Sequence, residues 1–222
     1  MSLFKSEGKL IKAVQRYPGI LVLDTVTVTN IKVLREVGVP EWNIVKLLER
    51  QPRALTKKRD RFKEIVAEVK EMGFNALTMG FVMAVAFKTC IGKSTWAKRV
   101  DLCKRWGWSD DEILAAFGRF PQFIMLLDDN IEKTMDFFVN QMGCGSSTIA
   151  RYPALLSLSL KKRIVPRASV IQVLLSKCLV KQLSFQQIFY SSEEVFLDKF
   201  ILCQGLEADE LLKLYQAKMD VV

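Results

Sequence analysis

The feature that most constrains the fold of this sequence is an internal repeat with a period of about 35 residues. Four X-Pro pairs, each followed by apolar residues, mark it: Tyr17-Pro18, Gln51-Pro52, Phe120-Pro121 and Tyr152-Pro153. Glycines recur between them in steps of 35, 34 and 36 residues, at Gly38, Gly73, Gly107 and Gly143. A fixed period of this length is typical of proteins built from stacked supersecondary units.

The proline and glycine markers keep a common register. Gly38 precedes Pro52 by 14 residues, and Gly107 precedes Pro121 by the same 14. The third repeat has Phe87 in the proline slot, the fifth repeat is shorter, and a sixth is predicted to begin with Cys178 in the glycine position. Two positions relative to that of the repeat proline are apolar in five repeats. Four residues before the proline position stand Val14, Leu48, Met83, Phe117 and Ile149. Three residues after it, in what we call the second apolar column, stand Leu21, Leu55, Cys90, Ile124 and Leu156.

Local signals within a repeat predict helices. Ser109 to Glu112 form a capping box, which satisfies the first free backbone N–H groups of a helix. Pro121, which lacks an N–H, ends that helix. A second helix is expected to begin near Asp129 and Asn130 and to stop at Gly143, because glycine favours the left-handed turn at a helix end. Each repeat is thus predicted to be helix, proline break, apolar connector, helix and glycine turn.

Two short helices cannot bury enough apolar surface alone, so neighbouring repeats are expected to stack into an all-α solenoid. We predict a single domain over residues 1–222, with a repeat array in residues 1–192 and an acidic C-terminal cap in residues 193–222. The aromatic residues expected to pack between repeats are Trp42, Phe74, Trp96 and Trp106.

Composition argues against several functions. The chain has no histidine, the commonest general base and metal ligand. Its five cysteines form no CxxC pair and are predicted to be small core residues, so neither a metal nor another cofactor is expected. A Gly-rich phosphate loop is absent, and the Asp110-Asp111 and Asp128-Asp129 pairs lie at predicted helix starts, where carboxylates cap. The longest apolar run, Phe81–Phe87, is far shorter than the ~20 residues of a membrane helix. We therefore expect that the protein is not an enzyme and that it has no membrane partner.

The formal net charge of +9 is unevenly placed. Residues 1–111 hold 21 basic and 12 acidic side chains, whereas residues 112–222 hold 12 of each. Residues 193–222 carry seven acidic side chains against three lysines, so we expect this cap to make no phosphate contacts and to offer a surface to a protein partner.

Two sets of basic residues recur with the repeat. An arginine stands two residues before the proline in four repeats, at Arg16, Arg50, Arg119 and Arg151. The planar guanidinium fork suits phosphate oxygens, although each arginine can instead cap the end of its own helix. A second group lies where the connector meets the second helix: Arg53, Lys57, Lys58, Arg59 and Arg61 in the second repeat, Lys88, Lys93, Lys98 and Arg99 in the third, and Lys161, Lys162, Arg163 and Arg167 in the fifth. Any one of these runs can be a solvated face, but solubility does not require periodicity.

The pattern resembles the mTERF family of organellar transcription termination factor-like proteins, in a form typical of plants. The resemblance covers nearly the whole chain. It lies in the recurrent R-x-P, in the G-W-S-x-x-E-I run of residues 107–113, and in residues 160–167, which are similar to the family's L-x-x-R-I-x-P-R stretch. The closing Leu211–Tyr215 run is also similar to the ends of plant members.

The resemblance implies a left-handed superhelix of repeats of about 34–36 residues, each with two α-helices and a short 3₁₀ helix, curved into a half-ring whose basic concave face binds nucleic acid. It also implies a monomer that regulates gene expression in a mitochondrion or chloroplast, through transcription termination or RNA processing, with double-stranded DNA or organellar RNA as partner. The first residues have no signal-peptide or transit-peptide pattern, so we expect either that the chain is not imported or that it is a truncated or processed form without its presequence. The alternative is a helical-repeat scaffold that binds protein partners without touching nucleic acid, and sequence does not choose DNA over RNA.

Overall fold

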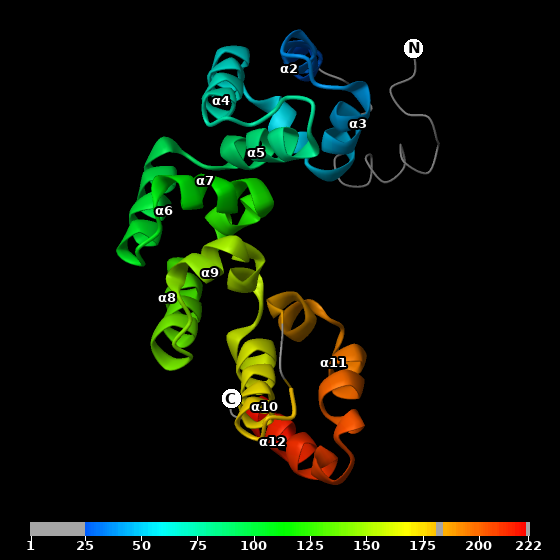
Figure 1. Ribbon diagram of the computed structural model, residues 1–222. Coiled ribbons are helices and arrows are strands. Elements are labelled where there is room, and N and C mark those ends of the chain that lie inside the picture. Colours follow the sequence, from blue (N-terminus) through cyan, green and yellow to red (C-terminus); the bar gives the residue numbers. More distant parts are fainter. Residues whose placement is uncertain (1–24, 181–183, 221–222) are drawn as a thin grey trace. The chain divides into compact units, whose positions relative to one another are not determined.

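The structure, a computed structural model, describes residues 25–180 and 184–220, and all regular secondary structure in these ranges is helical (Figure 1). The α-helices are α2 (Thr25–Glu36), α3 (Glu41–Arg50), α4 (Arg59–Glu71), α5 (Met79–Cys90), α6 (Lys93–Arg105), α7 (Asp110–Arg119), α8 (Asp128–Asp136), α9 (Ser146–Arg151), α10 (Val165–Ser176), α11 (Glu193–Phe200) and α12 (Ala208–Asp220). The 3₁₀ segments are η2 (Pro52–Thr56), η3 (Pro121–Met125), η5 (Pro153–Ser157) and η8 (Leu202–Glu207), and the π-helical turns are η4 (Phe137–Gln141), η6 (Leu160–Ile164) and η7 (Gln186–Tyr190). The predicted all-α repeat fold is confirmed.

The proline and glycine markers have the predicted local structures. Each of the three described 3₁₀ segments after a first helix begins at the repeat proline, because a first helical position needs no N–H donor. The repeat glycines all have left-handed backbones, with φ between 66° and 89°. Cys178 is left-handed as well, with φ of 56°, the one such non-glycine residue among those the structure describes. The sixth repeat therefore begins where the sequence predicts it.

The third repeat departs from the others because Phe87 replaces the proline. Helix α5 continues through this slot to Cys90, and only two residues separate it from α6. A backbone N–H at this position lets the helix continue where a proline would end it. Cys90 is consequently exposed at the helix end, so the second apolar column is interrupted in this repeat alone among those described.

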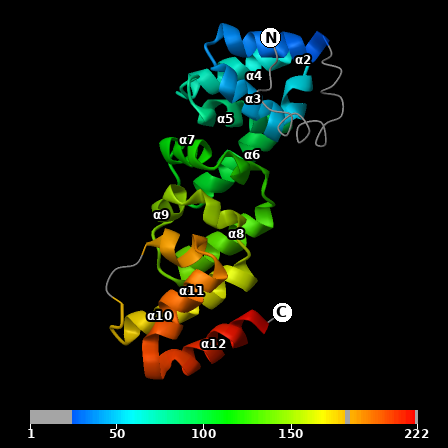
Figure 2. The same cartoon turned by 90° about the vertical axis from the view of Figure 1, so that its right-hand side faces the viewer.

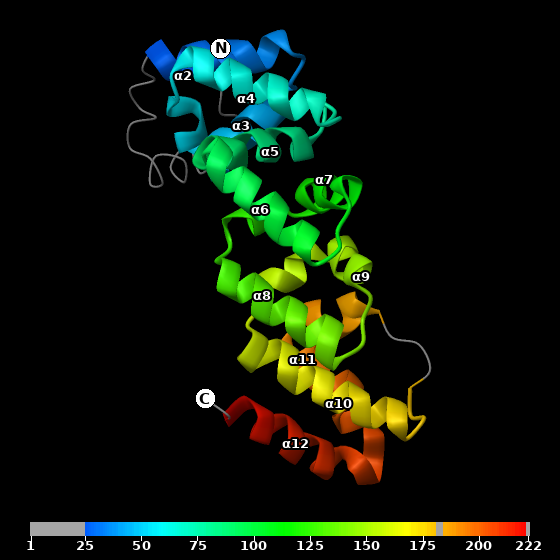
Figure 3. The same ribbon diagram turned by 90° about the vertical axis from the view of Figure 1, so that its left-hand side faces the viewer.

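Residue contacts divide the chain into two compact units. The described part of the first unit comprises residues 25–128 and 146–153, and that of the second residues 129–145 and 154–220. Within the first unit, α3, α5, α7 and α9 pack each on the next, and α2 packs on α4 (Figure 2 and Figure 3). Within the second unit, α10 packs against α12. The sequence prediction of one array with an acidic cap stays a prediction.

Aromatic packing joins successive repeats of the first unit. The ring of Phe117 meets Phe74 and Trp96 edge to face, with centroid distances of 5.8 and 4.9 Å. Such pairs contribute about 0.5–1.5 kcal/mol beyond their buried area. The expectation for Trp42 is wrong, because its side chain is 54% exposed and lies under the ammonium of Lys46.

The cysteines are mostly not core residues. Cys103 is buried, and burial raises the pKa of its thiol to about 12. Cys144 is half-buried, whereas Cys90, Cys178 and Cys203 are exposed. The prediction of core cysteines therefore holds for Cys103 and is wrong for the three exposed ones.

Candidate nucleic-acid interface

The arginines that precede the repeat prolines stand at equivalent ends of the first helices. Arg50, Arg119 and Arg151 are the last residues of α3, α7 and α9, and all three side chains are exposed. These helices belong to the first compact unit, in which α5 packs between α3 and α7. A cation at a helix C-terminus is favoured by the helix dipole, so this placement suits both capping and phosphate binding. Arg16 lies outside the described residues.

Exposed cations surround the beginning of α4. Arg53 lies on η2, Lys57 and Lys58 form the link to α4, and Arg59 is the first residue of that helix. No side chain caps this N-terminus, and Asp60 is the acidic residue of its first turn. Cations at a helix N-terminus oppose the helix dipole and repel one another, so they do not stabilise α4. Backbone N–H groups and positive charges together favour an anion at this place.

Other second helices begin in the same way. Lys93 opens α6, and Lys161 and Lys162 lie in the first turn of the continuous η6–α10 segment, without an acidic residue in either first turn. By contrast, α7 begins with Asp110, Asp111 and Glu112 and α11 with Glu193 and Glu194, whereas α5 and α9 have no acidic residue in the first turn. The side chains of Lys93, Lys161 and Lys162 are exposed, and that of Arg163 is half-buried.

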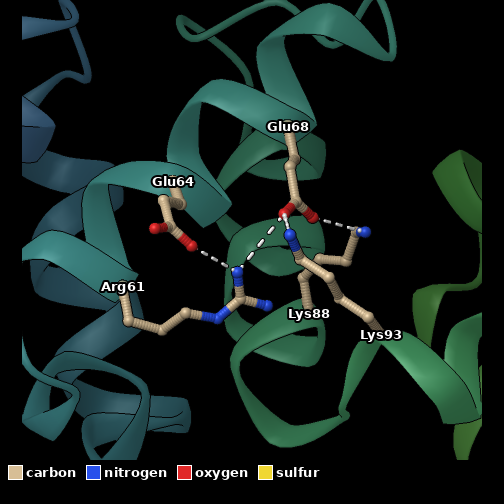
Figure 4. Close-up of polar contacts among 5 residues, drawn as sticks. All are labelled: Arg61, Glu64, Glu68, Lys88 and Lys93. Atoms are coloured by element: carbon tan, nitrogen blue, oxygen red, sulfur yellow. Dashed lines mark hydrogen bonds and ion pairs between the residues drawn. The ribbon is translucent and has the colours of Figure 1, made fainter.

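Arg61 and Lys88 are engaged inside the first unit around Glu68. The Glu68 carboxylate accepts from Lys88 Nζ at 2.8 Å and from Arg61 Nη1 at 3.3 Å, while Lys93 Nζ lies 3.7 Å away (Figure 4). Burial acts to raise the pKa of Glu68, but the hydrogen bond and charge of Lys88, with those of Arg61, lower it overall. Lys88 is also buried over the ring of Trp96. These contacts remove Lys88 from the predicted binding set, whereas Lys93 stays 72% exposed.

Two arginines predicted as phosphate contacts are buried. Arg99 donates from Nε to the carbonyl of Ile124 at 3.3 Å and from Nη2 to that of Leu126, and its Nη1 pairs with Asp128 at 2.7 Å. Arg167 is fully buried and donates from Nη1 to the carbonyls of Ile188 at 2.8 Å and Ser191 at 3.0 Å. Both assignments are corrected, because neither side chain can reach a phosphate in solvent.

The ring of Phe196 lies 4.6 Å below the Arg167 guanidinium. Burial lowers the pKa of Arg167, against the opposing effects of the hydrogen bond that Arg167 donates to the Tyr215 hydroxyl and of the charge of Glu193. The arginine of the L-x-x-R-I-x-P-R stretch that the structure buries is therefore the final one, Arg167, while Arg163 keeps partial exposure.

The described residues contain no cluster of three or more Cys, Asp or Glu side chains placed to hold a metal ion. No helix in the described ranges is long and apolar enough to cross a bilayer.

The model of the mTERF family matches residues 3–95 and 79–197, which together cover most of the chain. The chain belongs to the mTERF family. Among its relatives, transcription termination factor MTERF15, mitochondrial, of Arabidopsis thaliana is 33% identical over 76 residues, which are 34% of this chain and 17% of that protein. Transcription termination factor MTERF8, chloroplastic, of the same plant is 22% identical over 138 residues, 62% of this chain and 28% of that protein. The matched parts thus span under a third of either relative.

The burial of the two arginines in this mTERF chain has a sequence signal that charge counting overlooks. Arg99 is followed by Leu102 and Cys103 at helical spacing, and both are buried. Arg167 is likewise followed by Val170 and Ile171 on the buried face of α10. An arginine on the apolar stripe of a helix is expected to be buried with carbonyl or carboxylate partners, whatever basic residues adjoin it.

Proposed function

We propose that this chain is a non-catalytic, nucleic-acid-binding regulator of gene expression in a mitochondrion or chloroplast, and that it binds double-stranded nucleic acid. The phosphates would be held by Arg50, Arg119 and Arg151, together with two basic clusters. The second-repeat cluster is Arg53, Lys57, Lys58 and Arg59, and the fifth-repeat cluster is Lys161, Lys162 and Arg163. The observation that carries the proposal is that both clusters lie at starts of second helices, where exposed cations oppose the helix dipole.

The physical argument concerns what these cations do without a ligand. Adjacent like charges repel, and the positive end of a helix adds to that repulsion. The unfavourable energy is relieved when a polyanion places phosphate oxygens near the cations and releases its condensed counterions. Membership of the mTERF family supports the regulatory role, and the names of the two plant relatives support an organellar location. Termination or RNA processing would be the regulated step.

Salt-titrated binding tests the proposal on duplex DNA, double-stranded RNA and single-stranded RNA of ~20 units. About five phosphate contacts in all predict a slope of log K against log salt near −4.5 for duplex DNA and about −3.5 for a single strand. A slope near zero on every substrate would overturn the proposal and leave the protein scaffold as the better hypothesis.

Charge reversal locates the contacts. The triple variant Arg50→Glu, Arg119→Glu and Arg151→Glu is expected to abolish preferred binding. A matched control is Lys32→Glu, Lys63→Glu and Lys70→Glu, which makes the same charge change in the first unit at exposed positions of α2 and α4. Equal losses in the two triple variants would contradict a specific role for the arginines and would indicate an effect of net charge alone.

The acidic C-terminal region is proposed to contact a protein rather than nucleic acid. Val195, Leu202 and Leu206 are exposed there among acidic side chains, a combination that suits a protein surface with apolar and basic groups. Binding of nucleic acid should therefore be insensitive to changes in this region.

A further inference from the structure

A buried asparagine holds the connector that carries the second-repeat cluster. Asn30 lies on α2 and is fully buried. Its Nδ2 donates to the carbonyl of Leu55 at 2.9 Å and to the carbonyl of Lys57 at 2.7 Å. One amide group thus ties α2 both to η2 and to the first residue of the link between η2 and α4.

The same device recurs two repeats later. Arg99 stands 69 residues after Asn30, and its acceptors Ile124 and Leu126 stand 69 residues after Leu55 and Lys57. In both cases a side chain of one repeat's second helix donates to one carbonyl near the end of the next repeat's 3₁₀ segment and to another in the link that follows it. The recurrence at equivalent positions indicates that fixing this connector is a property of the repeat.

The residue that donates to each connector is basic where acidic residues follow the connector and neutral where basic residues follow it. Arg99 faces a connector followed by Asp128 and Asp129, and it pairs with Asp128. In the second compact unit, Arg167 holds the carbonyls of Ile188 and Ser191, which are followed by Glu193 and Glu194.

Asn30 is neutral, and the residues after its connector are the cations Lys57, Lys58 and Arg59. A cation at position 30 would repel them, whereas an amide supplies the same donors without charge.

We infer that Asn30 is a positioning residue for nucleic-acid binding, which fixes the Lys57 peptide so that Lys57, Lys58 and Arg59 face phosphate from a preset backbone. The inference rests on the proposed function. Leu55 is fully buried and anchors one end of the connector, while the Asn30 amide anchors the other. Without that amide, the peptide after Thr56 loses its fixed orientation, and the entropy cost of ordering the connector exceeds the gain, so the contacts of Lys57 and Lys58 with phosphate are not made.

Asn43 provides a matched control within the same compact unit. It is as fully buried as Asn30, and its Nδ2 donates to the carbonyl of Leu77 at 3.0 Å. The Oδ1 atoms of both asparagines are buried without a hydrogen-bond partner among the described residues. The segment held by Asn43, residues 75–77, carries no basic side chain. The two asparagines therefore differ in two ways: Asn30 holds two carbonyls and Asn43 one, and only the connector held by Asn30 carries basic side chains.

The experiment compares Asn30→Leu with Asn43→Leu in the whole chain. Binding to a ~20-base-pair duplex is titrated with salt at a temperature well below the unfolding midpoint of both variants. We expect both variants to lose thermal stability, Asn30→Leu the more, because two carbonyls lose their donor in that variant and one in Asn43→Leu. In Asn30→Leu alone, the slope of log K against log salt should decrease in magnitude by about 2, and binding should be about tenfold weaker at 0.1 M salt. Equal binding by the two variants would overturn the inference, and failure of the unchanged chain to bind would overturn the proposed function instead.

A double-mutant cycle separates positioning from a general structural effect. Asn30→Leu is combined with Lys57→Gln and Lys58→Gln. If Asn30 acts through these lysines, adding Asn30→Leu to the double lysine variant changes affinity by less than about twofold. A further tenfold loss in that background would show that Asn30 acts elsewhere and would contradict the inference.

Discussion

At the scale of single residues, the molecule uses arginine in two opposite ways. Arg151 at the end of α9 keeps its guanidinium in solvent, where it stays available to a polyanion. Arg167 is buried away from water and donates hydrogen bonds to the carbonyls of Ile188 and Ser191. Burial of a charged group is costly, so the arrangement is stable only while those partners are present. Losing the arginine would leave its buried carbonyl acceptors without a donor.

The first prediction separates these two uses. Arg167→Met should lower the free energy of unfolding by about 3 kcal/mol, because the acceptors lose their charged donor, and should leave the salt slope of binding unchanged. Lys162→Met, at an exposed position one turn before the buried residues of α10, should change stability by no more than about 0.5 kcal/mol and reduce the slope by about 0.9. Urea unfolding and salt-titrated binding measure the two effects. A reduced slope for Arg167→Met in the folded state would contradict its structural role.

At the scale of elements, a left-handed residue follows the second helix in each of the first five repeats, at Gly38, Gly73, Gly107, Gly143 and Cys178. A glycine takes this backbone without steric cost, whereas a side chain costs roughly 1 kcal/mol. A Cβ atom at Gly107 would meet nothing within 4 Å, so backbone strain is the whole penalty there. Cys178 already bears that strain, with φ of 56°.

The second prediction follows as a pair of opposite changes. Cys178→Gly should raise the free energy of unfolding by about 0.5–1 kcal/mol, and Gly107→Ala should lower it by about 1 kcal/mol. Denaturant midpoints measured under reducing conditions test both. Destabilisation by Cys178→Gly would mean that side-chain contacts of the cysteine outweigh its backbone strain.

How far sequence predicts such elements depends on how local the signal is. Pro52, Pro121 and the repeat glycines act through their own backbones, so they predict the helix ends, the repeat and the position of Cys178 without knowledge of neighbours. The site is less predictable, because exposure depends on packing between repeats. The charges of Arg99 and Arg167 suggest a surface position, whereas their place on the apolar stripe of a helix indicates burial, and the acceptors that allow it come from the following repeat. The continuation of α5 through Phe87 is also not predicted by the sequence, because a missing proline permits the helix to continue without showing that it replaces the 3₁₀ segment.

At the scale of the whole molecule, the net charge of +9 attracts any polyanion over a long range. Binding through particular phosphate contacts must be distinguished from this general attraction. Residues 1–192 hold 30 basic and 17 acidic side chains, and the acidic C-terminal region lowers the total. Long-range attraction depends on the total charge, whereas counterion release depends on the phosphates that are actually neutralised. Two variants of equal charge therefore give different results under the two models.

The third prediction uses such a pair. Lys57→Gln with Lys58→Gln and Lys213→Gln with Lys218→Gln each remove two exposed positive charges, so both chains carry +7. Contact through the second-repeat cluster predicts a slope reduced by about 1.8 for the first variant and unchanged for the second, which alters α12. Binding titrations of each variant with one duplex, at one temperature and four salt concentrations, give both slopes. If the two variants weaken binding equally, total charge governs the affinity and the connectors hold no particular phosphates; if only the first does, the polyanion lies along the connector that Asn30 holds in place.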